Sequence, residues 1–216
     1  MFIQKALLTP NKYSRPQTPL TKVNGVVVHY VGNTSSTAIN NRNYFESLKN
    51  TGKTYASSHY IIGLQGEIIQ CVPENEIAYC SNDRNSDTIS IENCHPKADG
   101  KFSEDTYKSL IWLLADICKR YKLNPLKDII RHYDVNKKKC PLFYVNKPND
   151  WIKLREDVKM KMEEKKTIVT TGDEALKYLA EIGIINSPDY WQHLIGKINY
   201  FESLLVSFVN KYKEKS

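Results

Sequence analysis

Residues 25–29 read Gly25-Val26-Val27-Val28-His29, an unbroken apolar run that ends in a histidine. A run this short and this rich in β-branched residues is typical of a strand that is buried on both faces. We therefore expect a strand over residues 25–31, and its terminal His29 is a candidate metal ligand.

Hydrophobic patterns on either side of this run predict alternating strands and helices. Strands are expected over residues 55–62, 67–72, 87–94 and 128–132, and helices over 37–49, 103–121 and 150–165. In the strand 87–94, Ile89 and Ile91 fall on one face, and Ser90 and Glu92 on the other. Ser103 is the expected N-cap of the long second helix. These elements predict an α/β or α+β domain around one sheet.

A change of composition near residue 160 predicts a boundary, with a domain over 1–160, a linker over 161–172 and a small all-α module over 173–216. Helices of this module are expected at residues 173–181, 188–197 and 198–212. The last one carries an apolar stripe at 3- and 4-residue steps: Ile198, Phe201, Leu205, Phe208 and Tyr212. We expect the stripe to pack within the module; a seam between two chains is the alternative.

The second informative stretch is Arg131-His132-Tyr133-Asp134-Val135-Asn136-Lys137-Lys138-Lys139-Cys140-Pro141, which has the pattern H-x-D-x-x-x-K-x-C-P. His132 and Cys140 are good zinc ligands, and with His29 they leave one coordination position open. Catalytic zinc sites have this form, whereas structural sites are usually closed by four protein ligands. The pattern predicts a metallohydrolase; the alternative is a capped turn beside an unrelated buried thiol.

A hydrolase also needs groups that stabilise an oxyanion and transfer protons. Lys138 could donate to the oxyanion, or belong to a solvated lysine run. Glu92 is the best candidate for proton transfer, although a carboxylate on such a strand can also face solvent. Asp134 would cap the loop or orient a ligand from outside the metal's coordination shell. His59 lies in an apolar context that favours a core histidine over a fourth ligand.

The charge and cysteine content of the chain limit the kinds of partner and compartment that we expect. The formal net charge of +7 is unevenly distributed, with +8 in residues 1–166 and −1 in residues 167–216. A basic first region suits an anionic target, such as nucleic acid or a bacterial wall, or is simply a solvated surface. Paired finger spacing and an aromatic-basic recognition motif are both missing, which argues against nucleic acid. Five unpatterned cysteines are expected to be free thiols. With no signal segment and no apolar run long enough to span a bilayer, we expect a soluble chain made in the cytoplasm.

Four segments together resemble one family, the zinc-dependent type-two N-acetylmuramoyl-L-alanine amidases, which include phage endolysins and are related to peptidoglycan recognition proteins. The segments are Val27-Val28-His29, Ser58-His59-Tyr60-Ile61-Ile62, Ser90-Ile91-Glu92 and the motif that runs from His132 to Pro141. They occur in the family's order and cover about residues 20–155. One position departs from it: some relatives have a tyrosine where this chain has Ser58, which makes Glu92 more important for proton transfer.

The resemblance implies a mixed central sheet flanked by helices, with Zn²⁺ in a surface groove. His29, His132 and Cys140 would bind the zinc, Lys138 would stabilise the oxyanion and Glu92 would be the general base. His59 and Asn85 are predicted to contact the substrate.

The implied reaction is hydrolysis of the amide between N-acetylmuramic acid and L-alanine in peptidoglycan. We expect an endolysin that reaches the wall after release from the cytoplasm; a host autolysin, a spore-wall amidase and a non-catalytic peptidoglycan-binding protein are the alternatives. The resemblance does not extend to residues 173–216, which we expect to bind the wall or to mediate self-association.

Overall fold

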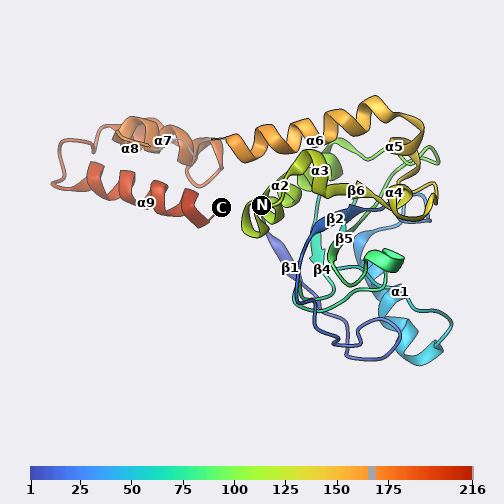
Figure 1. Ribbon diagram of the computed structural model, residues 1–216. Helices are drawn as coiled ribbons and strands as arrows, with labels where there is room; N and C mark the ends of the chain where they lie inside the picture. The colour runs from blue at the N-terminus through green and yellow to red at the C-terminus, as the bar shows by residue number, and fades with distance from the viewer. Residues whose placement is uncertain (165–168, 216) are drawn as a thin grey trace. The chain divides into compact units, whose positions relative to one another are not determined.

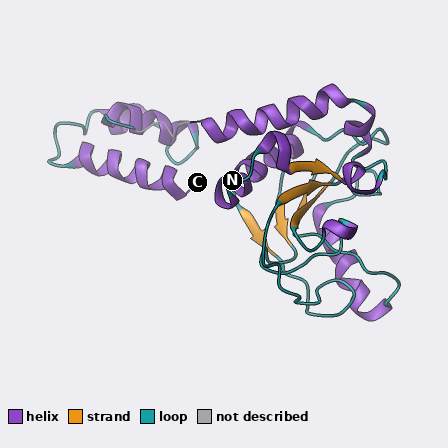
Figure 2. Ribbon diagram, viewed as in Figure 1, coloured by secondary structure: helices purple, strands orange, loops and turns teal. Residues whose placement is uncertain are grey.

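Six short strands form one mixed sheet in the computed structural model, which describes residues 1–164 and 169–215. Their order is β1-β4-β3-β5-β2-β6, and all neighbouring pairs are parallel except the antiparallel pair of β3 and β4. The strands are β1 (Ile3–Lys5), β2 (Gly25–Val28), β3 (Tyr60–Ile62), β4 (Ile68–Gln70), β5 (Thr88–Asn93) and β6 (Ile129–Arg131). The mixed sheet with flanking helices confirms the predicted fold class (Figures 1 and 2).

The chain divides into two units after Glu163. Helices of the first unit are α1 (Ala38–Thr51), the 3₁₀ helix η1 (Asn82–Arg84), α2 (Glu104–Tyr121), α3 (Pro125–Asp128), α4 (His132–Asn136), α5 (Leu142–Asn146) and α6 (Pro148–Glu163). Those of the second unit are α7 (Gly172–Glu181), α8 (Pro188–Gln192) and α9 (Phe201–Lys215). Within both units, no helix of the described residues is long and apolar enough to cross a bilayer.

Alternate strand residues supply two cores, one on each face of the sheet. Ile89 and Ile91 pack with residues of α2 and α6, as the period-2 pattern predicts, whereas Ile61 and Ile69 pack beneath α1 (Figure 1). Each fully buried side chain of this size contributes about 1.5–3 kcal/mol to folding. Because both faces of the sheet are covered, polar side chains on the strands reach solvent mainly at the strand ends.

Helix caps follow the local sequence. The Ser103 hydroxyl accepts a hydrogen bond from the backbone N–H of Thr106, which confirms the expected N-cap of α2. Helix α1 ends at Gly52, whose φ of 59° places it in the left-handed region. A Cβ at this position would lie 2.9 Å from the Tyr13 ring, so both the conformation and the neighbouring ring favour glycine.

Element boundaries differ from the predictions at strand ends and in the second unit, where the helix expected over 188–197 ends at Gln192 and the helix expected over 198–212 spans Phe201–Lys215. Strand β3 begins at Tyr60 rather than residue 55, because the backbone N–H groups of Ala56 and Ser57 bond to the loop residues Tyr13 and Tyr79. Strand β2 ends at Val28, although His29 still donates its backbone N–H to β5. Strand β1 and helices α3, α4 and α5 were not expected, since elements of three to five residues are too short to show a period.

The second unit is all-α, as predicted, but the face that packs differs from the expected stripe. Its core contains Val169, Ala175, Leu179 and Val209, with Leu205 packed against it. Ile198, Phe208 and Tyr212 are 50%, 53% and 40% exposed, so the expected packing of the stripe is wrong for these three residues. Residues 165–168 of the predicted linker, and the expected last residue of the helix 150–165, lie outside the described residues.

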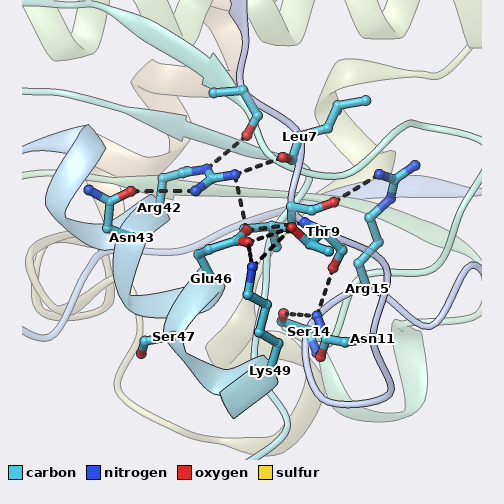
Figure 3. A network of polar contacts seen from close by, with 12 residues as sticks. Leu7, Thr9, Asn11, Ser14, Arg15, Arg42, Asn43, Glu46, Ser47 and Lys49 are labelled. Atoms are coloured by element: carbon cyan, nitrogen blue, oxygen red, sulfur yellow. Dashed lines mark hydrogen bonds and ion pairs between the residues drawn. The ribbon is translucent and has the colours of Figure 1, made fainter. Parts of the chain in front are cut away.

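A polar network fastens the N-terminal segment to α1 (Figure 3). The Glu46 carboxylate accepts hydrogen bonds from the backbone N–H and hydroxyl of Thr9, at 3.1 and 2.6 Å, and from Lys49 Nζ at 2.6 Å. It also forms an ion pair with Arg42, which in turn donates to the Leu7 carbonyl. Burial alone would raise the pKa of Glu46, but these donors outweigh it and lower the pKa to about 2.

Candidate active site

The candidate site lies where three parallel strands, β2, β5 and β6, reach their carboxyl ends. His29 directly follows β2, Glu92 is the fifth residue of β5, and His132 directly follows β6. Crevices at the carboxyl ends of parallel strands are common ligand sites in α/β folds. The topology therefore brings together residues that lie far apart in the sequence.

Three buried side chains form a cluster with metal-ligand spacing. The ligand atoms of His29, His132 and Cys140 all lie within 4.8 Å of one another, and His29 Nδ1 is 3.8 Å from Cys140 Sγ. Tetrahedral zinc, with Zn–N near 2.0 Å and Zn–S near 2.3 Å, would separate such a nitrogen and sulfur by roughly 3.6 Å. The spacing of the predicted ligands therefore fits a zinc ion.

The polar contacts of the two imidazoles support the same fit. His132 Nε2 donates to Asn82 Oδ1 at 2.8 Å, so Nδ1 carries a lone pair; this atom is buried and lacks a partner among the described residues. His29 Nε2 pairs with Ser81 Oγ at 3.0 Å, which leaves Nδ1 toward Cys140. Metal-binding histidines are commonly held in this way by their second nitrogen.

Burial controls the protonation of the cluster. It lowers the pKa of His132 to about 4 and that of His29 well below its ordinary value, with the Lys138 charge acting in the same direction. Burial also raises the pKa of the Cys140 thiol to about 12, and Glu92 adds to this effect. The imidazoles are therefore neutral at pH 7, as metal binding requires, and a dication would offset the cost of ionising the thiol.

A cavity of about 400 Å³ opens beside the cluster. Its walls bring together four of the predicted site residues: Asn85, Glu92, His132 and Lys138. Tyr55 and Tyr79 line it as well, and their rings meet edge to face at 5.5 Å. The cavity thus combines a carboxylate, an ammonium, a metal-ligand candidate and an aromatic wall.

Glu92 has the properties of a proton-transfer group. Burial raises its pKa to about 7, while a hydrogen bond from Cys80 and the charge of Lys138 act against the increase. Its Oε1 accepts from Cys80 Sγ at 3.6 Å, and its Oε2 is buried without a hydrogen-bond partner in the described part of the chain. A carboxyl group with a pKa near 7 is suited to both accepting and returning a proton.

Asp134 and Asn85 both stabilise loops at the site. Asp134 accepts from the Arg131 backbone N–H at 2.9 Å and from its guanidinium at 2.7 Å, and so caps α4 where His132 begins it. The imidazole of His132 is contacted by Asn82 and not by Asp134. Asn85 Oδ1 accepts from the backbone N–H groups of Cys80 and Ser81, and the Asn85 side chain also lines the cavity. Its predicted contact with substrate stays a prediction.

The structure does not bring His59 to the cavity wall. The residue is completely buried, and its Nε2 donates to the Glu76 carbonyl at 2.9 Å while its Nδ1 faces Ser90 Oγ at 3.1 Å. Both ring nitrogens are therefore satisfied within the protein. This is the core histidine that the apolar sequence context favours, and the predicted contact of His59 with substrate stays a prediction.

Three neighbouring residues of the site, Cys80, Ser81 and Asn82, were missed in the sequence. Each contacts a different site residue: Glu92, His29 and His132, respectively. Asn82 has a φ of 51°, a conformation that asparagine tolerates better than most residues. The small polar run before η1 indicates a turn, but its approach to the histidines is a long-range contact that local spacing does not reveal.

Comparisons with known proteins agree with this geometry. A profile of the N-acetylmuramoyl-L-alanine amidase family matches residues 19–142, which include all the predicted site residues. The chain is 35% identical over 183 residues to N-acetylmuramoyl-L-alanine amidase CwlL of Bacillus licheniformis, covering 79% of this chain and 50% of that protein. It is 33% identical over 175 residues to N-acetylmuramoyl-L-alanine amidase BlyA of Bacillus subtilis (strain 168), covering 72% and 46%. The chain thus spans about half the length of these curated relatives.

Solved structures show the same fold. The structure of PlyL matches with a TM-score of 0.62 at 24% identity, covering 73% of this chain and 97% of PlyL. The solution structure of the PlyG catalytic domain matches with a TM-score of 0.63 at 24% identity, covering 79% and 100%. The family profile spans more than half of the chain, and the fold agrees with it. The chain therefore belongs to the N-acetylmuramoyl-L-alanine amidase family.

Proposed function

We propose that this protein is a zinc-dependent amidase that hydrolyses the bond between N-acetylmuramic acid and L-alanine in bacterial peptidoglycan. The observation that carries the proposal is the buried cluster of His29, His132 and Cys140 beside a cavity lined by Glu92 and Lys138. Membership of the amidase family and relatives named as such amidases support the choice of reaction.

His29, His132 and Cys140 are the residues that would hold the zinc. A bound zinc ion would supply Lewis-acid polarisation of the scissile carbonyl and would acidify water. Glu92 accepts the proton of the attacking water and passes it to the leaving amine, a dual role that its pKa near 7 permits. Lys138, on the cavity wall, donates to the oxygen on which negative charge develops.

The cavity supports recognition of a substrate that is part sugar and part peptide. Its Tyr55 and Tyr79 rings offer apolar faces, and Asn85 adds an amide group to the wall. The protein would act on the bacterial cell wall, and we propose that it is a phage endolysin that lyses the host. A host autolysin or spore-wall enzyme would use the same chemistry, and the genes that flank this one would distinguish these roles.

Mass spectrometry of purified peptidoglycan incubated with wild type, Cys140→Ser and Glu92→Ala tests the proposal. Wild type should release stem peptides that begin with a free L-alanine amino group, and both variants should lose this product. Metal analysis should find zinc in wild type and Glu92→Ala but little in Cys140→Ser, because Cys140 is a proposed zinc ligand and Glu92 is not. If zinc-loaded wild type leaves the amide bonds uncleaved, the proposed amidase activity is refuted and a non-catalytic peptidoglycan-binding protein is favoured.

A further inference from the structure

Cys80 is a thiol at the active site to which the proposed reaction gives no role. The other four cysteines are buried, whereas Cys80 is partly exposed and lines the cavity next to Glu92. A thiol in this place can bind a metal, react or orient a neighbour. Its ligand atom lies within 4.8 Å of those of His29 and Glu92, and its direct contact with the Glu92 carboxylate points to the last role.

The contact between Cys80 and Glu92 has a defined direction. Cys80 Sγ lies 3.6 Å from Glu92 Oε1, within range of a hydrogen bond that involves sulfur. An ionised carboxylate can only accept, so the thiol is the donor. Among the described residues, Cys80 is the one hydrogen-bond donor to this carboxylate, and Oε2 has no partner. Oε1 is therefore the oxygen that the thiol holds.

Cys80 is itself held in place through its backbone. Its N–H donates to Asn85 Oδ1 at 3.0 Å, and the N–H of the next residue, Ser81, donates to the same oxygen at 2.6 Å. The loop that carries the thiol is therefore fixed beside Glu92.

We propose that Cys80 is a positioning residue, whose thiol donates to Oε1 of Glu92 and so fixes the orientation of the carboxylate that takes the proton from water. The inference rests on the proposed amidase function, because it assigns a partner to the general base of that reaction.

Kinetics of Cys80→Ala and Cys80→Ser on a soluble muramyl peptide provide the first test, with the zinc content of each protein measured. Loss of the donor in Cys80→Ala should lower kcat about tenfold, since a thiol is at the weak end of donors to a charged group. KM should change less than twofold, because the thiol acts on Glu92 and not on the substrate. Serine retains an O–H donor and should restore kcat to within about threefold of wild type.

A matched control is Cys71→Ala, which removes a completely buried thiol on the face of the sheet beneath α1. It should lower thermal stability but leave kcat and zinc content unchanged. If Cys80→Ala and Cys80→Ser both keep the wild-type kcat, Cys80 has no positioning role. Equal losses of kcat and zinc in both variants would also overturn the proposal, because they would indicate damage to the metal site.

A spectroscopic test does not depend on turnover. The infrared S–H stretching band that disappears in Cys80→Ser belongs to Cys80, and a hydrogen bond to a carboxylate lowers its frequency. In Glu92→Ala this band should move to higher frequency; an unchanged band would overturn the assigned contact. A protein that shows the band shift but cleaves no muramyl peptide would refute the amidase function while leaving the contact established.

Discussion

Glu46 anchors the N-terminal segment to α1, and replacing it with glutamine should destabilise the first unit in a pH-dependent manner. In Glu46→Gln the side chain keeps its length but loses its charge, and one of its two acceptor oxygens becomes an amide donor. The ion pairs with Arg42 and Lys49 would be lost, together with part of the hydrogen bonding to Thr9. Stability is the affected property because Glu46 lies outside the cavity wall.

The size of the effect follows from the pKa of Glu46, which is about 2 in the folded protein against an ordinary value of 4.5. At about 1.36 kcal/mol per pKa unit this corresponds to at most ~3 kcal/mol. The carboxylate is 19% exposed, and solvent screens part of the interaction, so we expect a loss of about 1–2 kcal/mol at pH 7. Because the folded pKa is the lower one, this stabilisation is complete above about pH 4.5 and is lost as the pH falls toward 2.

Urea denaturation followed by tryptophan fluorescence measures this effect, with Trp191→Phe as the background so that only Trp112 and Trp151 of the first unit report. The stability difference between this background and its Glu46→Gln variant should shrink steadily between pH 4.5 and pH 2. Glu104→Gln, in an exposed helical ion pair with Lys108, is the control and should show no measurable change. A difference that is independent of pH over this range would refute the electrostatic reasoning.

Three further changes have defined outcomes. Asn82→Gly keeps the left-handed backbone conformation accessible but removes the amide that holds His132. Zinc affinity, measured by chelator competition, should therefore fall about 10–100-fold, and an unchanged affinity would show that Asn82 does not support His132 as a ligand. Lys138→Ala should lower kcat/KM on peptidoglycan fragments about 100-fold, whereas Lys139→Ala should not, and equal effects would show a general charge effect instead. Leu114 of α2 lies in the core, and Leu114→Ala should lower the free energy of unfolding by about 2–5 kcal/mol. A loss below about 1 kcal/mol in urea denaturation would mean that neighbouring side chains fill the space left by the leucine.

The sequence predicted the parts of the fold that repeat over enough residues to show a period. The alternation of Ile89 and Ile91 with Ser90 and Glu92, and the Ser103 cap of α2, are local properties and appear in the structure as expected. Strand β1 was not expected because its three residues gain their structure from pairing with β4, which lies more than sixty residues away. Local preference is weak for such an element, and the tertiary partner decides.

The candidate site divides in the same way. His29, His132 and Cys140 were predicted because residue type and order carry the signal, and the structure brings their ligand atoms together. The burial of Glu92 could not be predicted, since alternation tells which face a residue takes but not what covers that face. Asn82 escaped notice because its contact with His132 joins segments 50 residues apart and follows no motif.

The loop residues Cys80, Ser81 and Asn82 have a consequence for how this protein could evolve. They are consecutive, yet they contact Glu92, His29 and His132, so one backbone segment positions the proposed general base and two proposed zinc ligands at once. An insertion or deletion next to this segment cannot shift one contact without the others. A library randomised around the loop, and selected only for tighter zinc binding, should therefore yield variants whose turnover changes in step with their affinity.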